Sequence, residues 1–194
     1  MIPVKGSTGK SRLARPDRAE LATAIALDTI QAVCRSAHVS EVVVVTSDED
    51  VAGELARFPA RGRPRVVPDP GAGLNAAVTA GLDAVAAGRR GALLGDLPAL
   101  DPIDLDVALE LATRHARAFV PDAEGTGTTL ITAGAGAALE PAFGAGSRSR
   151  HAAAGFALLD LPATSTLRRD VDTADQLRAA AGLGLGPRTS ALVG

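Results

Sequence analysis

Short apolar runs alternate with longer amphipathic segments along almost the whole chain. After the apolar start of residues 1–4, the expected strands are Val42–Val45, Arg65–Val67, Gly91–Leu94, Ala118–Val120, Thr128–Ile131 and Ala157–Leu159. Helical spacing predicts helices over residues 17–36, 49–58, 74–87, 102–117 and 173–181. Strands that alternate with helices form a parallel sheet covered on both faces. The sequence therefore predicts an α/β, Rossmann-like fold with a mostly parallel sheet, in a single domain of residues 1–194 with a loose tail from Gly182.

Composition excludes several classes of function. A net charge of −2, with four Phe and no Trp or Tyr, offers neither a basic surface nor a stacking platform for nucleic acid. No apolar run reaches the roughly 20 residues that span a bilayer, and no signal segment is expected. The single cysteine, Cys34, excludes an internal disulfide and is expected to pack inside a helix rather than to catalyse. We expect a cytoplasmic protein that binds neither membrane nor nucleic acid.

The stretch from Gly91 to Leu100 places a carboxylate at the end of a buried strand. The apolar run ends at Gly95, Asp96 follows it, and Pro98 prevents the strand from continuing. In open α/β sheets, ligands bind beyond the carboxyl ends of the strands. A carboxylate at this position can hold a hard cation such as Mg²⁺. Taken alone, Asp96 could equally cap a turn.

The segment from Lys5 to Arg12 (KGSTGKSR) is a glycine-containing basic loop. A P-loop needs a glycine five residues before the Gly of GK[ST], and that position is Val4, so a P-loop hydrolase is excluded by spacing. The cations Lys5, Lys10 and Arg12 suit a polyphosphate. A solvated basic loop is the alternative for these residues.

Three further segments carry polar groups beside glycines. Asn75, in Gly73-Leu74-Asn75, can cap a helix or face a nucleobase edge. The segments Gly125–Thr129 and Phe143–Ser147 offer hydroxyls and backbone donors that can hold an anion, the second of them before a helix start. Ordinary turns are the alternative for both.

The segment Arg168–Thr173 lies between the last predicted strand and the last predicted helix. Thr173 or Asp172 can cap that helix, or Asp172 can meet Asp96 across the site and complete a pair of carboxylates for Mg²⁺. The three histidines show no metal-ligand spacing. Of these, His151 follows the Phe143–Ser147 segment and is expected near the site, whereas His115 is expected at the surface.

In this order the motifs resemble the 2-phospho-L-lactate / phosphoenolpyruvate guanylyltransferase family, which acts in biosynthesis of the deazaflavin coenzyme F(420). The resemblance covers nearly the whole chain. It rests on PVK with KSRL at the start, GLN, GDLP, Asp122 with GTGTT, FGAGS with His151, and DVDT. In the family the first strand is longer, which leaves open a start upstream of Met1. The loop of residues 6–9 also departs from the family pattern.

The resemblance implies a nucleotidyltransferase-type fold and a Mg²⁺-dependent transfer of GMP from GTP to a three-carbon phospho-acid, phosphoenolpyruvate or 2-phospho-L-lactate, with release of pyrophosphate. It implies that Asp96 and Asp172 hold the metal. It assigns Lys5, Lys10 and Arg12 to catalysis and to the GTP phosphates, and Gly73 and Asn75 to the nucleotide. The residues implied to bind the phospho-acid are Thr129, Gly144 and Ser147.

Two other functions stay open at this point. A molybdenum-cofactor guanylyl- or cytidylyltransferase resembles this fold, although the glycine-rich opening LAGGxSxRMG typical of that class is absent. A non-catalytic nucleotide-binding module would bind GTP and release no pyrophosphate. The sequence also leaves open which residues select guanine, and whether the protein forms a homo-oligomer.

Overall fold

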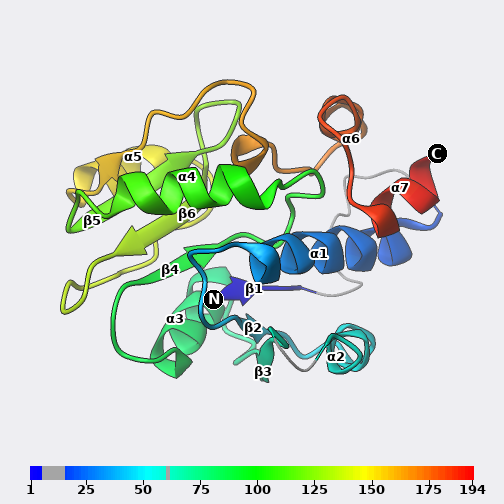
Figure 1. Ribbon diagram of the computed structural model, residues 1–194, viewed down its shortest axis with the longest axis horizontal. Coiled ribbons are helices and arrows are strands. Elements are labelled where there is room, and N and C mark those ends of the chain that lie inside the picture. Colours follow the sequence, from blue (N-terminus) through cyan, green and yellow to red (C-terminus); the bar gives the residue numbers. More distant parts are fainter. Residues whose placement is uncertain (6–15, 60–61) are drawn as a thin grey trace.

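The computed structural model describes residues 1–5, 16–59 and 62–194 (Figure 1). The strands are β1 (Ile2–Pro3), β2 (Val43–Val45), β3 (Arg65–Val67), β4 (Arg90–Leu93), β5 (Arg117–Pro121), β6 (Thr128–Ala133) and β7 (Ala157–Leu158). The helices are α1 (Arg18–Arg35), α2 (Glu49–Ala56), α3 (Leu74–Ala84), α4 (Pro102–Ala112), α5 (Ser147–Ala153), the 3₁₀ helix η1 (Thr166–Arg168), α6 (Ala174–Ala181) and α7 (Pro187–Val193).

The strands lie side by side in the order β3-β2-β1-β4-β6-β5-β7. Two hydrogen bonds join the halves of this sheet: Met1 N donates to the carbonyl of Gly91 (2.8 Å), and Leu93 N donates to the carbonyl of Met1 (3.1 Å). One residue that bonds to two residues spaced by two on its neighbour is the pattern of a parallel pair. Only β6, among the described strands, runs antiparallel to its neighbours β4 and β5. The predicted mostly parallel sheet is confirmed.

Helices cover both faces of the sheet, as the alternating strand pattern predicted (Figure 1). The valines of β2 show why: Val44 packs into a core with α1, α2 and α4, whereas Val43 and Val45 pack into a second core with α3 and the segment before α5. Successive strand side chains point to opposite faces, so a run of valines buries both. Both cores are built from aliphatic side chains and a few phenylalanines.

The tail beyond Gly182 is not loose, so that prediction was wrong. Helix α7 packs against α1, where the buried carboxylate of Asp28 accepts hydrogen bonds from the backbone N–H groups of Arg188 (3.2 Å) and Thr189 (2.7 Å). Gly186 lies so close to Asp28 that an added Cβ would come within 2.4 Å of its carboxyl carbon. A carboxylate that satisfies the first N–H groups of a helix fixes where the helix begins.

The predicted elements otherwise agree with the observed ones to within a few residues. The largest difference is at α4, which ends at Ala112, five residues before the predicted end. The chain needs those residues to turn back into β5, which begins at Arg117. The expected helix start at Ser147 is confirmed by α5.

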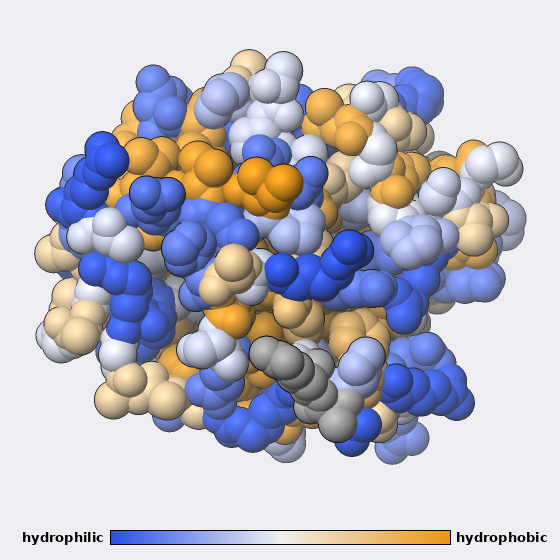
Figure 2. Space-filling view, in the orientation of Figure 1, coloured by the Kyte–Doolittle hydropathy of each residue, from blue (hydrophilic) through white to orange (hydrophobic). Residues whose placement is uncertain are grey.

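The molecular surface is mixed, with an apolar band over α4 (Figure 2). Ile103 and Val107 of this helix are 68% and 46% exposed. Within the described ranges, none of the helices is both long and apolar enough to cross a bilayer.

Cys34 lies near the end of α1 and packs against the first core, where burial raises the pKa of its thiol to about 11. A thiol of this pKa stays protonated at neutral pH, as expected of a packing residue.

Candidate functional site at the carboxyl edge of the sheet

The sheet changes its direction of winding between β1 and β4. From β1 the chain continues to β2 on one side, whereas β4 leads to β6 and β5 on the other, which is the switch point where open α/β sheets bind ligands. Gly95 ends β4 so close to β1 that an added Cβ would lie 3.0 Å from the carbonyl oxygen of Pro3. The glycine therefore allows the two strands to end side by side. Asp96 follows at this edge.

Three segments that are distant in sequence meet beside Asp96. The N–H of Val171 donates to the carbonyl of Asp96 (3.0 Å), and the N–H of Ala123 donates to the carbonyl of Arg168 (2.7 Å). The end of β4, the turn after β5 and the segment between η1 and α6 are thereby held together by backbone hydrogen bonds. Each segment contributes carboxylates to one place.

The carboxylates form a cluster that could hold a metal ion. Ligand oxygens of Asp122, Glu124 and Asp170 all lie within 4.8 Å of one another. Oδ1 of Asp170 is buried and has no hydrogen-bond partner among the described residues. Burial, together with the charges of Asp96, Asp122, Glu124 and Asp172, raises the pKa of Asp170 to about 7. Carboxylate oxygens that repel one another are the ligands that a hard divalent cation stabilises, so the residues fit such an ion.

Two members of this cluster also have structural roles. The carboxylate of Asp122 accepts from the N–H groups of Thr126 and Gly127, both at 2.8 Å, and so fixes the turn between β5 and β6. An added Cβ at Gly127 would lie 2.4 Å from Asp122 Oδ2, which requires glycine there. Glu124 pairs with Arg169 at 2.8 Å. Asp170 is therefore the member whose buried oxygen is left for a ligand.

The sequence-predicted metal residues Asp96 and Asp172 lie in the field of this cluster, since both charges raise the pKa of Asp170. Thr173, next to Asp172, caps α6 in a capping box with Gln176. Sequence reasoning missed Asp122, Glu124 and Asp170 as site residues. A signal was present, because Asp122 follows β5 as Asp96 follows β4.

The antiparallel direction of β6 brings Thr129 to the same edge. The first residues of β6 lie beside the last residues of β4, so the N–H of Leu94 donates to the carbonyl of Thr129 (2.9 Å). Oγ1 of Thr129 is buried and, in the part of the chain that the structure describes, has no hydrogen-bond partner. A buried hydroxyl without a protein partner is free to bind a ligand.

Gly144 and Ser147, predicted beside Thr129, lie in the segment between β6 and α5. Gly144 has a φ of 113°, which favours glycine, and Ser147 is buried at the start of α5. His151 of α5 ties this segment to β6. Its Nε2 accepts from the N–H of Ala142 (3.1 Å), so its Nδ1 carries the proton and donates to Thr128 Oγ1 (2.9 Å).

Burial, together with the neighbouring Arg150 charge, lowers the pKa of His151 to about 4. The imidazole is fully buried among three phenylalanines, with ring centroids 5.3 Å from Phe143 and Phe156 and 6.1 Å from Phe119. It is therefore neutral at physiological pH. His151 therefore joins β6, through Thr128, to the segment before α5, through Ala142.

The helix α3 begins near the same segment. Its N-cap is Gly73, with a φ of 94°, so Asn75 is not the cap. Instead, Asn75 Oδ1 accepts from the N–H of Phe143 (2.8 Å), and Asn75 Nδ2 donates to the carbonyl of Phe143 (3.2 Å). The two predicted binding segments, Gly73–Asn75 and Phe143–Ser147, are thus in direct contact.

The predicted phosphate-binding cations are only partly described. Lys5 lies exposed just beyond β1, at the carboxyl edge. Lys10 and Arg12 fall outside the described residues.

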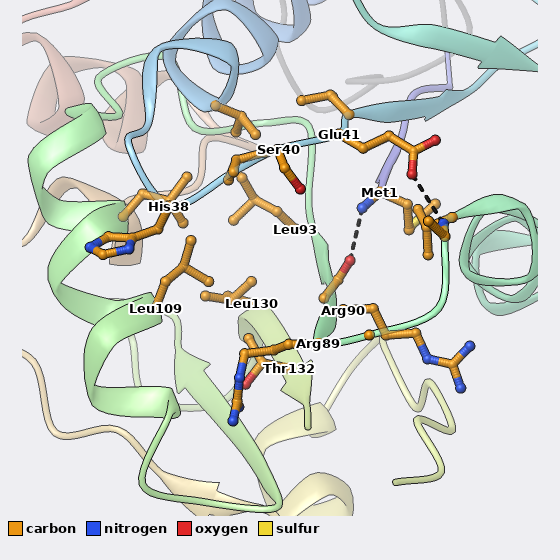
Figure 3. Close-up of a pocket in the computed structure, with 18 of the residues that line it drawn as sticks. Met1, His38, Ser40, Glu41, Arg89, Arg90, Leu93, Leu109, Leu130 and Thr132 are labelled. Carbon is orange, nitrogen blue, oxygen red and sulfur yellow. Dashed lines mark hydrogen bonds between the residues drawn. The ribbon is translucent and has the colours of Figure 1, made fainter. Parts of the chain in front are cut away.

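A cavity of about 360 Å³ lies at the opposite edge of the sheet (Figure 3). It surrounds Met1, the residues that lead into β2 and the first residues of β4. In Figure 3, Met1 N bonds to the carbonyl of Gly91 (2.8 Å), and the carboxylate of Glu41 accepts from Ala86 N (3.0 Å). This cavity holds none of the sequence-predicted site residues.

Comparison with known proteins agrees with this architecture. Residues 19–169 match the family described as the MobA-like NTP transferase domain. A phosphoenolpyruvate guanylyltransferase from Thermomonospora curvata is 48% identical over 201 residues, which cover 99% of this chain and 86% of that protein. Another from Geodermatophilus obscurus is 50% identical over 175 residues, which cover 90% and 79%.

Among solved structures, a nucleotidyl transferase from Methanothermobacter has a TM-score of 0.65 at 23% identity, covering 94% of this chain and 96% of that one. At this identity the likeness concerns the fold alone. The fold and the near full-length sequence matches agree. The chain belongs to the MobA-like NTP transferase domain family and, within it, to the phosphoenolpyruvate guanylyltransferases.

Proposed function

We propose that the protein transfers the GMP moiety of GTP to the phosphate of phosphoenolpyruvate and releases pyrophosphate. The observation that carries the proposal is the carboxylate cluster at the switch point, where Asp170 has a buried oxygen without a hydrogen-bond partner among the described residues. Relatives that bear the name of this activity match nearly the whole chain at 44–50% identity. The product of this proposed reaction would be a precursor of the deazaflavin coenzyme F(420).

The chemistry needs positioning and charge stabilisation more than it needs a base. An oxygen of the acceptor phosphate attacks the α-phosphorus of GTP, the bond to the β-phosphate breaks, and pyrophosphate leaves. The attacking oxygen is already ionised near neutral pH, so no side chain has to remove a proton. The barrier comes from the approach of two anions and from charge that builds on the leaving group.

The metal in this proposal is Mg²⁺, held by Asp96 and Asp172 together with the oxygens of the cluster. Carboxylate oxygens are the ligands that this ion prefers. When bound, the ion neutralises charge on the phosphates. These carboxylates would hold the ion, and Asp170 would add a charge that burial makes costly unless a cation compensates it.

The nucleotide is proposed to lie across the switch point. Lys5, together with Lys10 and Arg12 farther along the sequence, would pair with the triphosphate, since Lys and Arg bind phosphate through charge-assisted hydrogen bonds. Gly73, at the start of α3, would let the backbone approach the nucleoside closely.

The acceptor is proposed to lie over β6 and the segment before α5. The buried hydroxyl of Thr129 has no hydrogen-bond partner among the described residues, which leaves it available to an acceptor oxygen. Gly144 and Ser147 would complete this subsite. GTP and phosphorylated three-carbon acids are cellular metabolites, so we place the enzyme in the cytoplasm.

A panel of substrates tests the proposal. The protein is incubated with Mg²⁺, each of the four nucleoside triphosphates in turn, and phosphoenolpyruvate, 2-phospho-L-lactate or 3-phosphoglycerate, and pyrophosphate is measured. We expect release with GTP and phosphoenolpyruvate. Release with 2-phospho-L-lactate instead would change the acceptor, and binding of GTP without any release would identify a non-catalytic module.

A further inference from the structure

Two hydrogen bonds tie the first turn of α3 to the segment before α5. Asn75 Oδ1 accepts from Phe143 N–H at 2.8 Å, and Asn75 Nδ2 donates to the Phe143 carbonyl at 3.2 Å. A backbone N–H can only donate and a carbonyl can only accept, so the orientation of this amide is fixed by its partners. The Asn75 amide thus satisfies both the N–H and the carbonyl of Phe143, as the backbone of a neighbouring strand would.

The segment that Asn75 holds is also held from α5. Arg150 donates to the carbonyl of Ala142 through Nε (3.1 Å) and Nη2 (2.9 Å), and His151 Nε2 accepts from the N–H of Ala142. The phenyl ring of Phe143 is buried against His151. Ala142 and Phe143 are therefore fixed from two helices, and Gly144 follows them directly.

We infer that Asn75 is a positioning residue for the acceptor, which it serves by holding Phe143 and therefore Gly144 and Ser147 in place. The inference rests on the proposed function, in which those two residues bind the phospho-acid. Phe143 uses one hydrogen bond at each end of the Asn75 amide, so the side chain cannot offer the same donor–acceptor pair to a nucleobase. The pair also links the proposed nucleotide and acceptor subsites through one rigid contact.

Kinetics of Asn75→Ala test the inference, with Thr79→Ala as the matched control on the next turn of the same helix. Thr79 is exposed, and its hydroxyl donates within α3 to the carbonyl of Asn75 (3.0 Å). We expect the KM for phosphoenolpyruvate to rise by roughly tenfold in Asn75→Ala, because small misplacement of binding groups is costly. The KM for GTP should change by less than about twofold, and Thr79→Ala should match the wild type.

Each other outcome contradicts the inference. A raised KM for GTP, with weaker discrimination against ATP, would make Asn75 a base-reading residue. Unchanged KM values with a lowered melting temperature would make it purely structural. If the wild-type protein shows no turnover, the proposed function and the inference both fail. If the wild-type protein is active and Asn75→Ala has the same KM for phosphoenolpyruvate, only the inference fails.

Hydrogen exchange supplies a readout independent of turnover. The amide of Phe143 donates to Asn75, so its exchange should accelerate in Asn75→Ala and stay slow in Thr79→Ala. Asn75→Asp keeps the acceptor oxygen but places a second oxygen against the Phe143 carbonyl, which repels it. Exchange of the Phe143 amide should therefore accelerate in Asn75→Asp as it does in Asn75→Ala. Equal protection of the Phe143 amide from exchange in all three variants would contradict the pairing of Asn75 with Phe143.

Discussion

The backbone N–H of Val171 donates to the carbonyl oxygen of Asp96 at 3.0 Å, across 75 positions of sequence. This bond fixes the end of β4 against the segment that carries Asp170 and Asp172. It uses no side chain, and in that segment Oδ1 of Asp170 is buried without a hydrogen-bond partner among the described residues. The proposed metal centre therefore depends on the topology of the chain as much as on its acidic residues.

Asp96→Asn should lose at least about 100-fold in turnover, because a neutral amide does not replace a carboxylate in holding a cation whose charge offsets the phosphates. The variant should still fold, since the backbone carbonyl that accepts from Val171 is retained. Pyrophosphate release measures the loss, and circular dichroism measures the fold. The exposed Asp160 is a matched control, and Asp160→Asn should keep wild-type rates. Wild-type turnover in Asp96→Asn would reduce Asp96 to a turn-capping residue.

Asp170→Asn should abolish most of the stabilisation that Mg²⁺ confers. The native pKa of Asp170 is about 7 and its ordinary value is 3.8, so the native state binds more protons than the unfolded state between these values. Metal-free stability from this group therefore falls as pH rises through that window. At pH 8 the metal-free variant should melt above the metal-free wild type. Millimolar Mg²⁺ should raise the melting temperature of the wild type much more than that of the variant, and equal shifts would exclude Asp170 from the metal site.

His151 should make stability depend on acid pH. Its native pKa is about 4 and its ordinary value is 6.5, so the unfolded state binds more protons between these values. Stability is then complete above pH 6.5 and is lost as pH falls toward 4, by on the order of 3 kcal/mol. The free energy of unfolding, measured by urea titration from pH 4 to 7, should have a smaller slope in His151→Asn than in the wild type. His115→Asn, at an exposed histidine, should leave the slope unchanged; identical slopes in all three proteins would contradict the assignment.

Asp28→Ala should destabilise the protein by about 1–3 kcal/mol, because two N–H groups at the start of α7 lose their buried acceptor. The urea midpoint measures this change. Asp83 lies exposed on α3, and Asp83→Ala is the control that should stay near the wild-type value. A wild-type midpoint in Asp28→Ala would mean that α7 is held by its apolar contacts alone.

Much of the fold could be predicted because the strands are short, aliphatic and separated by helical spacing. Val42–Val45 could be read from its local pattern, since burial on both faces demands a continuous apolar run. Arg65–Val67 is mostly exposed, and its two valines and the following Pro68 marked it as a short strand. Helix α7 could not, because its stability comes from Asp28, which lies on α1 some 160 positions earlier. The antiparallel direction of β6 was equally invisible, since no local pattern records the direction of a neighbouring strand.

In the candidate site, too, local pattern was readable from the sequence and long-range contacts were not. The position of Asp96 just beyond β4 could be predicted because a buried apolar run ends shortly before it. The nearness of Asp170 to Asp122 and Glu124 could not, because long-range backbone bonds bring their segments together. The pairing of Asn75 with Phe143 was likewise hidden, because both residues are in segments that suit ligands when considered alone.

The most direct test of the central claim follows the α-phosphate of GTP. GTP labelled with ³²P at the α-position is incubated with the protein, Mg²⁺ and phosphoenolpyruvate, and the products are separated and weighed by mass spectrometry. The account predicts that the label enters a compound in which GMP is joined to phosphoenolpyruvate through its phosphate, with one pyrophosphate released for each product molecule. Label that stays in GTP, or that appears only in GDP or free GMP, would contradict it.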